Sequence, residues 1–194
     1  MIKRSKIILK TVCFITFVNS LSSCSFQKEL KNPSPLSANT LTALNGTYEI
    51  KSTNADSVSK KYWMYNNFLT EIDRKILSDT LKIDSLKSYS FSLTILSNKL
   101  CKISYLENNM IIRERLLKTK LKRDGYLYLK NKNVAFIFVP YLAGALDIKK
   151  TRLTKSLNGD LIFDVVSHRS GAFLVVMFLD GRTWNYRNEY NKIN

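Results

Sequence analysis

The sequence predicts an all-β protein, an antiparallel up-and-down barrel of about eight to ten strands with one amphipathic helix inserted after the first strand. Three dipeptides have the composition of tight hairpin turns: Asp124-Gly125, Asn158-Gly159 and Asp180-Gly181. Apolar and polar residues alternate strictly from Tyr89 to Ile95, as in a strand buried on one face. Turn signals recur about every ten residues from 80 to 187, which predicts a meander that hides its edges by closing.

The chain begins with the layout of a signal peptide. Its positive start consists of Lys3, Arg4, Lys6 and Lys10. The apolar stretch 11–18 that follows is far shorter than the roughly 20 residues of a membrane-spanning helix. Leu21-Ser22-Ser23-Cys24 resembles the lipobox of bacterial lipoproteins, and this resemblance implies cleavage after residue 23 and lipidation of Cys24. An ordinary secretory signal with an incidental cysteine is the alternative.

The residues after the lipobox bear on location. Ser25 stands where an Asp would retain a lipoprotein at the inner membrane, and residues 25–31 lack the acidic cluster that some bacteria use for surface export. The resemblance therefore implies a protein of the bacterial cell envelope, anchored through acylated Cys24 to membrane lipid, at the outer membrane and facing the periplasm.

Three segments follow from this division: a signal peptide over 1–23, a lipidated Cys and flexible tether over 24–37, and a barrel domain over 38–194. Pro33-Ser34-Pro35 marks the tether as extended, and we expect it to carry no core residues. A helical turn with Leu41 and Leu44 inward is expected next, before a first strand that opens at Gly46.

A helix is predicted from Ser57 to Arg74, with Asp56 or Ser57 as its cap. At 100° per residue its apolar arc contains Tyr62, Met64, Tyr65, Phe68, Leu69 and Ile72. Trp63 projects from the polar side. Two interpretations of it stay open: packing under a neighbouring loop, or contact with lipid headgroups or a partner, where Trp is favoured.

Two late segments are almost wholly apolar, Val134 to Leu146 and Ala172 to Leu179. The first contains Pro140 and Gly144, so we expect a strand to Val139, an irregular turn and another strand. The second is apolar on both faces, which requires a cover on its outside, and the amphipathic helix is the expected cover.

The entrance to the first strand carries a family resemblance. Leu44-Asn45-Gly46-Thr47-Tyr48 resembles the start of lipocalins, with Tyr48 at the position of their Trp. That family packs a late-strand Arg across the ring, which implies that Arg187 stacks on Tyr48 and closes the barrel base. The family's Thr-Asp-Tyr motif is missing, so the resemblance is to lipocalin-like bacterial lipoproteins.

The chain is strongly basic, with 31 Lys and Arg against 15 Asp and Glu and a net charge of +16. Such a charge is typical of nucleic-acid binding, but an exported protein rarely meets nucleic acid, so none is expected as a partner. Two explanations stay open: the composition bias of an AT-rich genome, or attraction to anionic lipids or lipopolysaccharide phosphates. Lys118, Lys120 and Lys122 alternate on one strand face as a solvated stripe.

Catalytic and metal chemistry find little support in these residues. His168 is the one histidine, and Cys101 is the one thiol outside the signal and lipobox, expected as a small buried hydrophobe. Asp164 and His168 share a strand face but lie about 13 Å apart along it, too far for a catalytic pair. We therefore expect no enzyme activity, no metal and no cofactor.

Two function classes remain. The first is a membrane-anchored lipoprotein that binds a small apolar ligand, a lipid or fatty acid, in a barrel pocket. Its pocket or lid residues would be Tyr62, Met64, Tyr65, Phe68 and Leu69. The alternative is a non-enzymatic structural or interaction lipoprotein whose self-filled barrel contacts anionic lipid, lipopolysaccharide or an envelope protein.

Overall fold

The structure is a computed structural model. It describes residues 26, 30–54, 68–72, 86–131, 134–139, 143–173 and 177–193.

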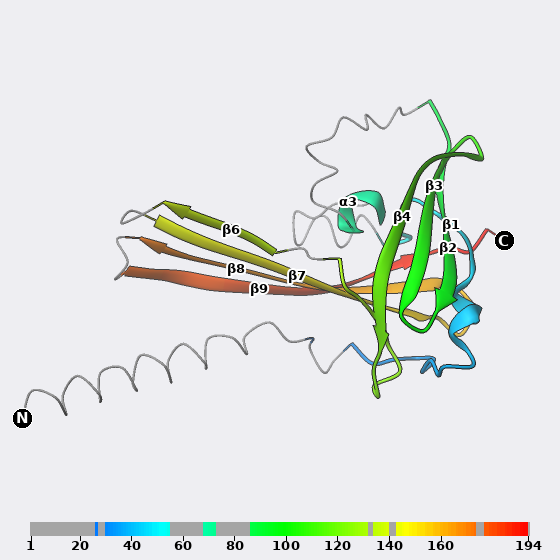
Figure 1. Cartoon of the computed structure of the whole chain (residues 1–194), viewed down its shortest axis with the longest axis horizontal. Helices are drawn as coiled ribbons and strands as arrows, with labels where there is room; N and C mark the ends of the chain where they lie inside the picture. The colour runs from blue at the N-terminus through cyan, green and yellow to red at the C-terminus, as the bar shows by residue number, and fades with distance from the viewer. Residues whose placement is uncertain are drawn as a thin grey trace, which may run out of the picture.

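The predicted all-β class is confirmed. The strands are β1 (Gly46–Glu49), β2 (Tyr89–Ser97), β3 (Leu100–Glu107), β4 (Met110–Leu121), β5 (Leu127–Leu129), β6 (Val134–Val139), β7 (Ala143–Lys155), β8 (Leu161–Phe173) and β9 (Met177–Tyr190). All paired neighbours are antiparallel, in the order β1-β2-β3-β4-β5-β7-β8-β9, with β6 also paired to β7. The sheet curls into a half-barrel, with β1 to β4 turned across the long strands β7 to β9 (Figure 1).

β5 and β6 occupy one strand position between them. Leu127 of β5 pairs with Leu153, and Val134 of β6 pairs with Ile148, on the edge of β7 that β8 leaves open. They therefore act as two pieces of a single broken strand, and the sheet has eight strand positions, within the predicted range.

The long strands β7 to β9 continue beyond the half-barrel as an arm. We define the arm as β6 together with residues 143–148 of β7, 168–173 of β8 and 177–183 of β9, which pair with one another in that order. Figure 1 shows the arm projecting from the barrel.

The first strand meets the last at one point. Tyr48 bridges to Lys192, the N–H of Glu49 donates to the Asn191 carbonyl at 3.0 Å, and the N–H of Ile193 donates to the Thr47 carbonyl at 2.8 Å. Before β1, the 3-10 helix η1 (Leu41–Leu44) buries Leu41 and Leu44, as predicted.

Described side chains pack into one hydrophobic core inside the half-barrel. Phe68, the first residue of α3 (Phe68–Ile72), is 0% exposed and stacks on Phe91 with ring centroids 3.7 Å apart and an angle of 3°. Its ring also meets Phe163 and Tyr190 edge-on, at 5.3 and 5.2 Å. Phe68 therefore lies at the centre of an aromatic cluster within the described core.

Much of the predicted helix lies outside the described residues. Phe68–Ile72 is helical. Tyr62, Trp63, Met64 and Tyr65 lie outside the described residues, as does the side chain of Leu69. Among the predicted pocket or lid residues, Phe68 is the one whose side chain is described, and it lies in the core.

Candidate functional site

A basic groove lies on the outer face of β4. Leu117 and Thr119 of that strand are each 4% exposed, so strand alternation turns Lys118 and Lys120 outward. Lys99, from the turn before β3, and Lys130, just after β5, lie on the same groove. The groove has a volume of about 770 Å³.

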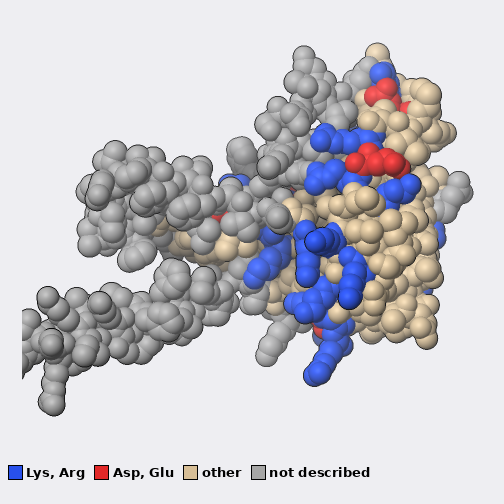
Figure 2. Space-filling view, viewed as in Figure 1, with Lys and Arg blue, Asp and Glu red and all other residues tan. Residues whose placement is uncertain are grey.

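A second groove of about 530 Å³ shares Lys120 and Lys130 with the first. It adds three cationic side chains: Lys122, Lys150 and Arg152. Asp124 is the one acidic residue among those that line it. We call the two grooves together the basic face, and Figure 2 shows Lys and Arg side chains gathered on it. Such a concentration of one sign of charge attracts anions.

Asp164 is the most buried charged residue beside this face. Phe163 and Val165 belong to the core, so alternation places Asp164 on the outside of the sheet, yet it is 0% exposed. Arg152 Nε donates to Asp164 Oδ2 at 3.0 Å, and Arg187 Nε donates to Asp164 Oδ1 at 2.7 Å. Burial alone would lower the pKa of Arg187. The hydrogen bond from Arg187 to Asp164 and the negative charge of Asp164 outweigh this effect, so the pKa of Arg187 is raised above its ordinary value.

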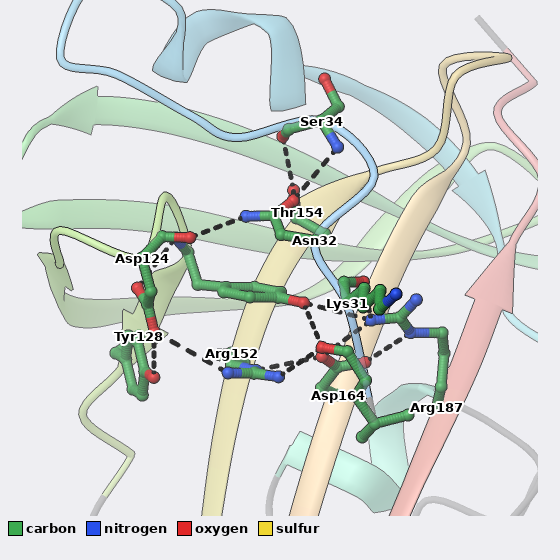
Figure 3. A network of polar contacts seen from close by, with 11 residues as sticks. Lys31, Asn32, Ser34, Asp124, Tyr128, Arg152, Thr154, Asp164 and Arg187 are labelled. Carbon is green, nitrogen blue, oxygen red and sulfur yellow. Dashed lines mark hydrogen bonds and ion pairs between the residues drawn. The ribbon is translucent and has the colours of Figure 1, made fainter. Parts of the chain in front are cut away.

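The two arginines also bind the N-terminal part of the chain (Figure 3). Arg152 Nη2 donates to the Leu30 carbonyl at 3.1 Å and Arg187 Nη2 to the Lys31 carbonyl at 2.9 Å. The Tyr126 hydroxyl donates to the Leu30 carbonyl at 2.9 Å. Asp164 thus binds two arginines, and each of them also donates a hydrogen bond to a backbone carbonyl of the N-terminal segment.

We call residues 30–36 the N-terminal strap. Thr154 Oγ1 lies 2.8 Å from both Asn32 Oδ1 and the Ser34 carbonyl, and the N–H of Leu36 donates to the Gly125 carbonyl at 2.9 Å. Leu36 is 5% exposed and belongs to the core. The expectation that the segment before residue 38 carries no core residues was therefore wrong for the strap, because donors on the sheet satisfy its extended backbone.

Phe26 brings the chain before the strap to the second groove. Its ring meets Tyr128 edge-on at 5.7 Å, Arg152 Cζ lies 4.2 Å from its centroid, and it lines the groove. Cys24, the predicted lipidation site, lies outside the described residues and two positions before Phe26 in the sequence.

The expected stacking of Arg187 on Tyr48 was wrong. Tyr48 is 1% exposed inside the half-barrel, where its ring stacks on Phe91 at 5.5 Å and its hydroxyl donates to the Leu44 carbonyl at 2.8 Å. Burial, with a smaller effect of the negative charge of Asp160, raises the pKa of Tyr48 to about 12. Tyr186 also belongs to the core, so alternation turns Arg187 to the opposite face.

Two other sequence predictions concern isolated side chains. Cys101 is 0% exposed, as expected, and burial, partly opposed by a hydrogen bond with the Leu117 backbone, raises the pKa of its thiol to about 12. His168 Nδ1 lies 2.8 Å from Thr183 Oγ1 on the surface, while Asp164 binds the two arginines.

A substitution at Gly125 tests whether the strap packs against the turn at Asp124-Gly125. Its φ is +72°, and an added Cβ would lie 2.6 Å from Pro35 Cβ and 2.8 Å from Pro35 Cα. We expect Gly125→Ala to destabilise the fold by about 1–2 kcal/mol from the backbone alone, and by more from the clash. Urea unfolding measures this, and Gly159→Ala, with a φ of +95° but nothing within 4 Å, separates the two costs. Equal losses in both variants would place the strap elsewhere.

No protein-family model matches the chain, and no match was found among the curated proteins or the solved structures. Among the described residues, no helix has the length and apolar character needed to cross a membrane.

Proposed function

We propose that this protein is a non-enzymatic lipoprotein of the bacterial cell envelope whose basic face binds the phosphate groups of anionic lipid. Acylated Cys24 would anchor it to the same membrane, at the outer membrane and on the periplasmic side. One observation carries the proposal: seven Lys and Arg side chains line two adjoining grooves, and Phe26, two residues from Cys24, lines one of them.

The position of the basic face supports this source of phosphate over a free anion. The strap and Phe26 hold the chain before the sheet against β5 and β7, so an acyl anchor at Cys24 would bring the grooves to the headgroup level. Each Lys or Arg near an anionic surface contributes about 1 kcal/mol to binding, within a Debye length of the lipid.

A small apolar ligand inside the barrel stays a prediction. The Phe68 ring occupies part of the interior, against Phe91, Phe163 and Tyr190. This packing supports the alternative, an interaction protein with a self-filled barrel that binds its partner on the outside of the sheet.

Lipidation of Cys24 is tested by metabolic labelling. Cells fed a clickable palmitate analogue should label the full chain, and Cys24→Ser should carry no label because the thioether acceptor is gone. Cys101→Ser serves as the control, since a thiol that is 0% exposed offers no acceptor and its loss should leave the label unchanged. Label that persists in Cys24→Ser would rule out this anchor.

The basic face is tested by removing three exposed lysines that line it. For residues 25–194, the variant Lys118→Gln/Lys120→Gln/Lys130→Gln should lose about 3 kcal/mol of binding to phosphatidylglycerol vesicles, or roughly 100-fold in partitioning. Vesicle co-sedimentation measures the partitioning, and circular dichroism checks the fold.

The matched control is Lys51→Gln/Lys155→Gln/Lys192→Gln, which removes the same charge from residues outside both grooves. We expect this control to lose far less binding. Equal losses in the two triple variants would show that total charge, and not the grooves, attracts the lipid.

A further inference from the structure

The outer end of the arm is apolar at every position. It comprises three paired levels: Ile137 to Val139, Ala143 to Ala145, Gly171 to Phe173, and Met177 to Leu179. In the next level Ser170 lies opposite Leu146, and Asp180 follows Leu179. The register aligns these stretches, since Ala143 lies opposite Phe173 and Phe173 opposite Met177. A sheet that is apolar at every position is apolar on both faces, whichever way its residues alternate. Figure 1 shows no described helix or strand stacked on it.

A row of charged residues borders this apolar end. Asp147 lies opposite Arg169, and Arg169 lies opposite Arg182. Arg169 Nε donates to Asp147 Oδ2 at 2.9 Å, and Arg169 Cζ lies 5.8 Å from the Trp184 ring centroid. A boundary with Arg beside Trp is typical of a membrane–water interface.

The base of the arm adjoins the basic face. Lys150, three residues beyond Asp147 on β7, lines the same groove as Phe26. The apolar end therefore begins close to the surface that we propose binds lipid phosphate.

The depth of the apolar end fits within one leaflet. Its three levels on β7, Ala143 to Ala145, reach the end of the strand. At about 3.3 Å per residue they span about 10 Å, less than half of the roughly 30 Å hydrocarbon core of a bilayer.

The apolar character of both faces also favours lipid. A protein partner on one sheet face would leave the other face in water, whereas acyl chains surround both faces.

We infer that the outer end of the arm inserts into the hydrocarbon of one leaflet of the membrane at which the basic face binds. The inference rests on the proposed function for its membrane. Unpaired backbone groups at the two open edges of the described sheet are costly in lipid, and this cost limits insertion to the last three residue levels.

Tryptophan quenching tests the insertion. The full chain, with Trp63→Phe and Trp184→Phe, receives a single new Trp as Phe138→Trp on β6 and is reconstituted into phosphatidylcholine vesicles. The emission should be blue-shifted, and most of it should be lost when the acyl chains carry bromine. Phe178→Trp on β9 should behave the same way, and it supplies the test if the first variant misfolds.

Leu157→Trp is the control, because Leu157 is 85% exposed and lies outside the arm. Its emission should stay that of an indole in water and resist bromine. Unquenched Phe138→Trp and Phe178→Trp would overturn the inference, in favour of a second copy if cross-linking yields a dimer and of cover by the chain itself if it does not. Phosphatidylcholine has no net charge, so this result does not depend on the attraction of the lysines to an anionic surface.

Discussion

Replacing Asp164 by alanine is expected to lower the free energy of unfolding by about 3–5 kcal/mol, because it leaves two buried or half-buried guanidinium groups without their shared carboxylate. Asp164 is 0% exposed and accepts hydrogen bonds from Arg152 and Arg187. The same arginines bind carbonyls of the strap, so its docking should weaken as well. Urea unfolding gives the free energy, and limited proteolysis reports release of the strap.

Glu114→Ala supplies the comparison for Asp164. Glu114 pairs with Lys102 at 3.0 Å, but its side chain is 46% exposed, and an exposed pair contributes about 0–1 kcal/mol. If Asp164→Ala were no more destabilising than Glu114→Ala, the arginine cluster would not be what holds the strap to the sheet.

Phe68→Ala is expected to lower the free energy of unfolding by about 3–5 kcal/mol, because it opens a cavity in the aromatic core. Phe68 is 0% exposed and contacts Phe91, Phe163 and Tyr190. Thermal and urea unfolding measure the loss, and Leu157→Ala, at a residue 85% exposed, should change stability little.

The same variant bears on the apolar-ligand prediction. A self-filled barrel predicts that Phe68→Ala is less stable and that apolar ligands such as fatty acids bind the variant better than the parent. A parent protein that binds fatty acid stoichiometrically, with stability unchanged by Phe68→Ala, would instead favour a pocket that α3 does not fill.

Much of the fold was predictable because it depends on local patterns. The turns at Asp124-Gly125 and Asn158-Gly159 adopt positive φ at their glycines, 72° and 95°, and period-two alternation places Phe91 and Leu93 in the core. The turn predicted at Asp180-Gly181 was wrong, because these residues lie within β9, where the pairing with β8 shifts register. The break between β5 and β6 was not predicted, because it depends on how two short strands share one edge of β7.

The site was less predictable because it joins residues far apart in the chain. The stripe of Lys118, Lys120 and Lys122 was visible in the sequence, but its grooves require Lys99 and Lys130 from neighbouring segments. The sequence signal for the role of Asp164 is a charge inside the apolar run from Leu161 to Val166. Its two arginine partners come from other strands.

The register of β9 explains the error at Arg187. The lipocalin-like closure would require the Arg187 guanidinium to lie on the Tyr48 ring, but these two side chains lie on opposite faces of the sheet. Tyr186 and Tyr190 take the inward positions, so Arg187 lies outward and binds Asp164. A shift of one residue decides which face a side chain joins, and the short resemblance around Tyr48 contained no information on β9.

Binding of anionic lipid by the basic face is measured by comparing vesicles of phosphatidylglycerol with vesicles of phosphatidylcholine for the unsubstituted protein, residues 25–194, as salt is increased. We expect tighter binding to phosphatidylglycerol at low salt, with the excess over phosphatidylcholine falling steadily as ions screen the basic face. Equal binding to the two lipids at low salt would contradict it.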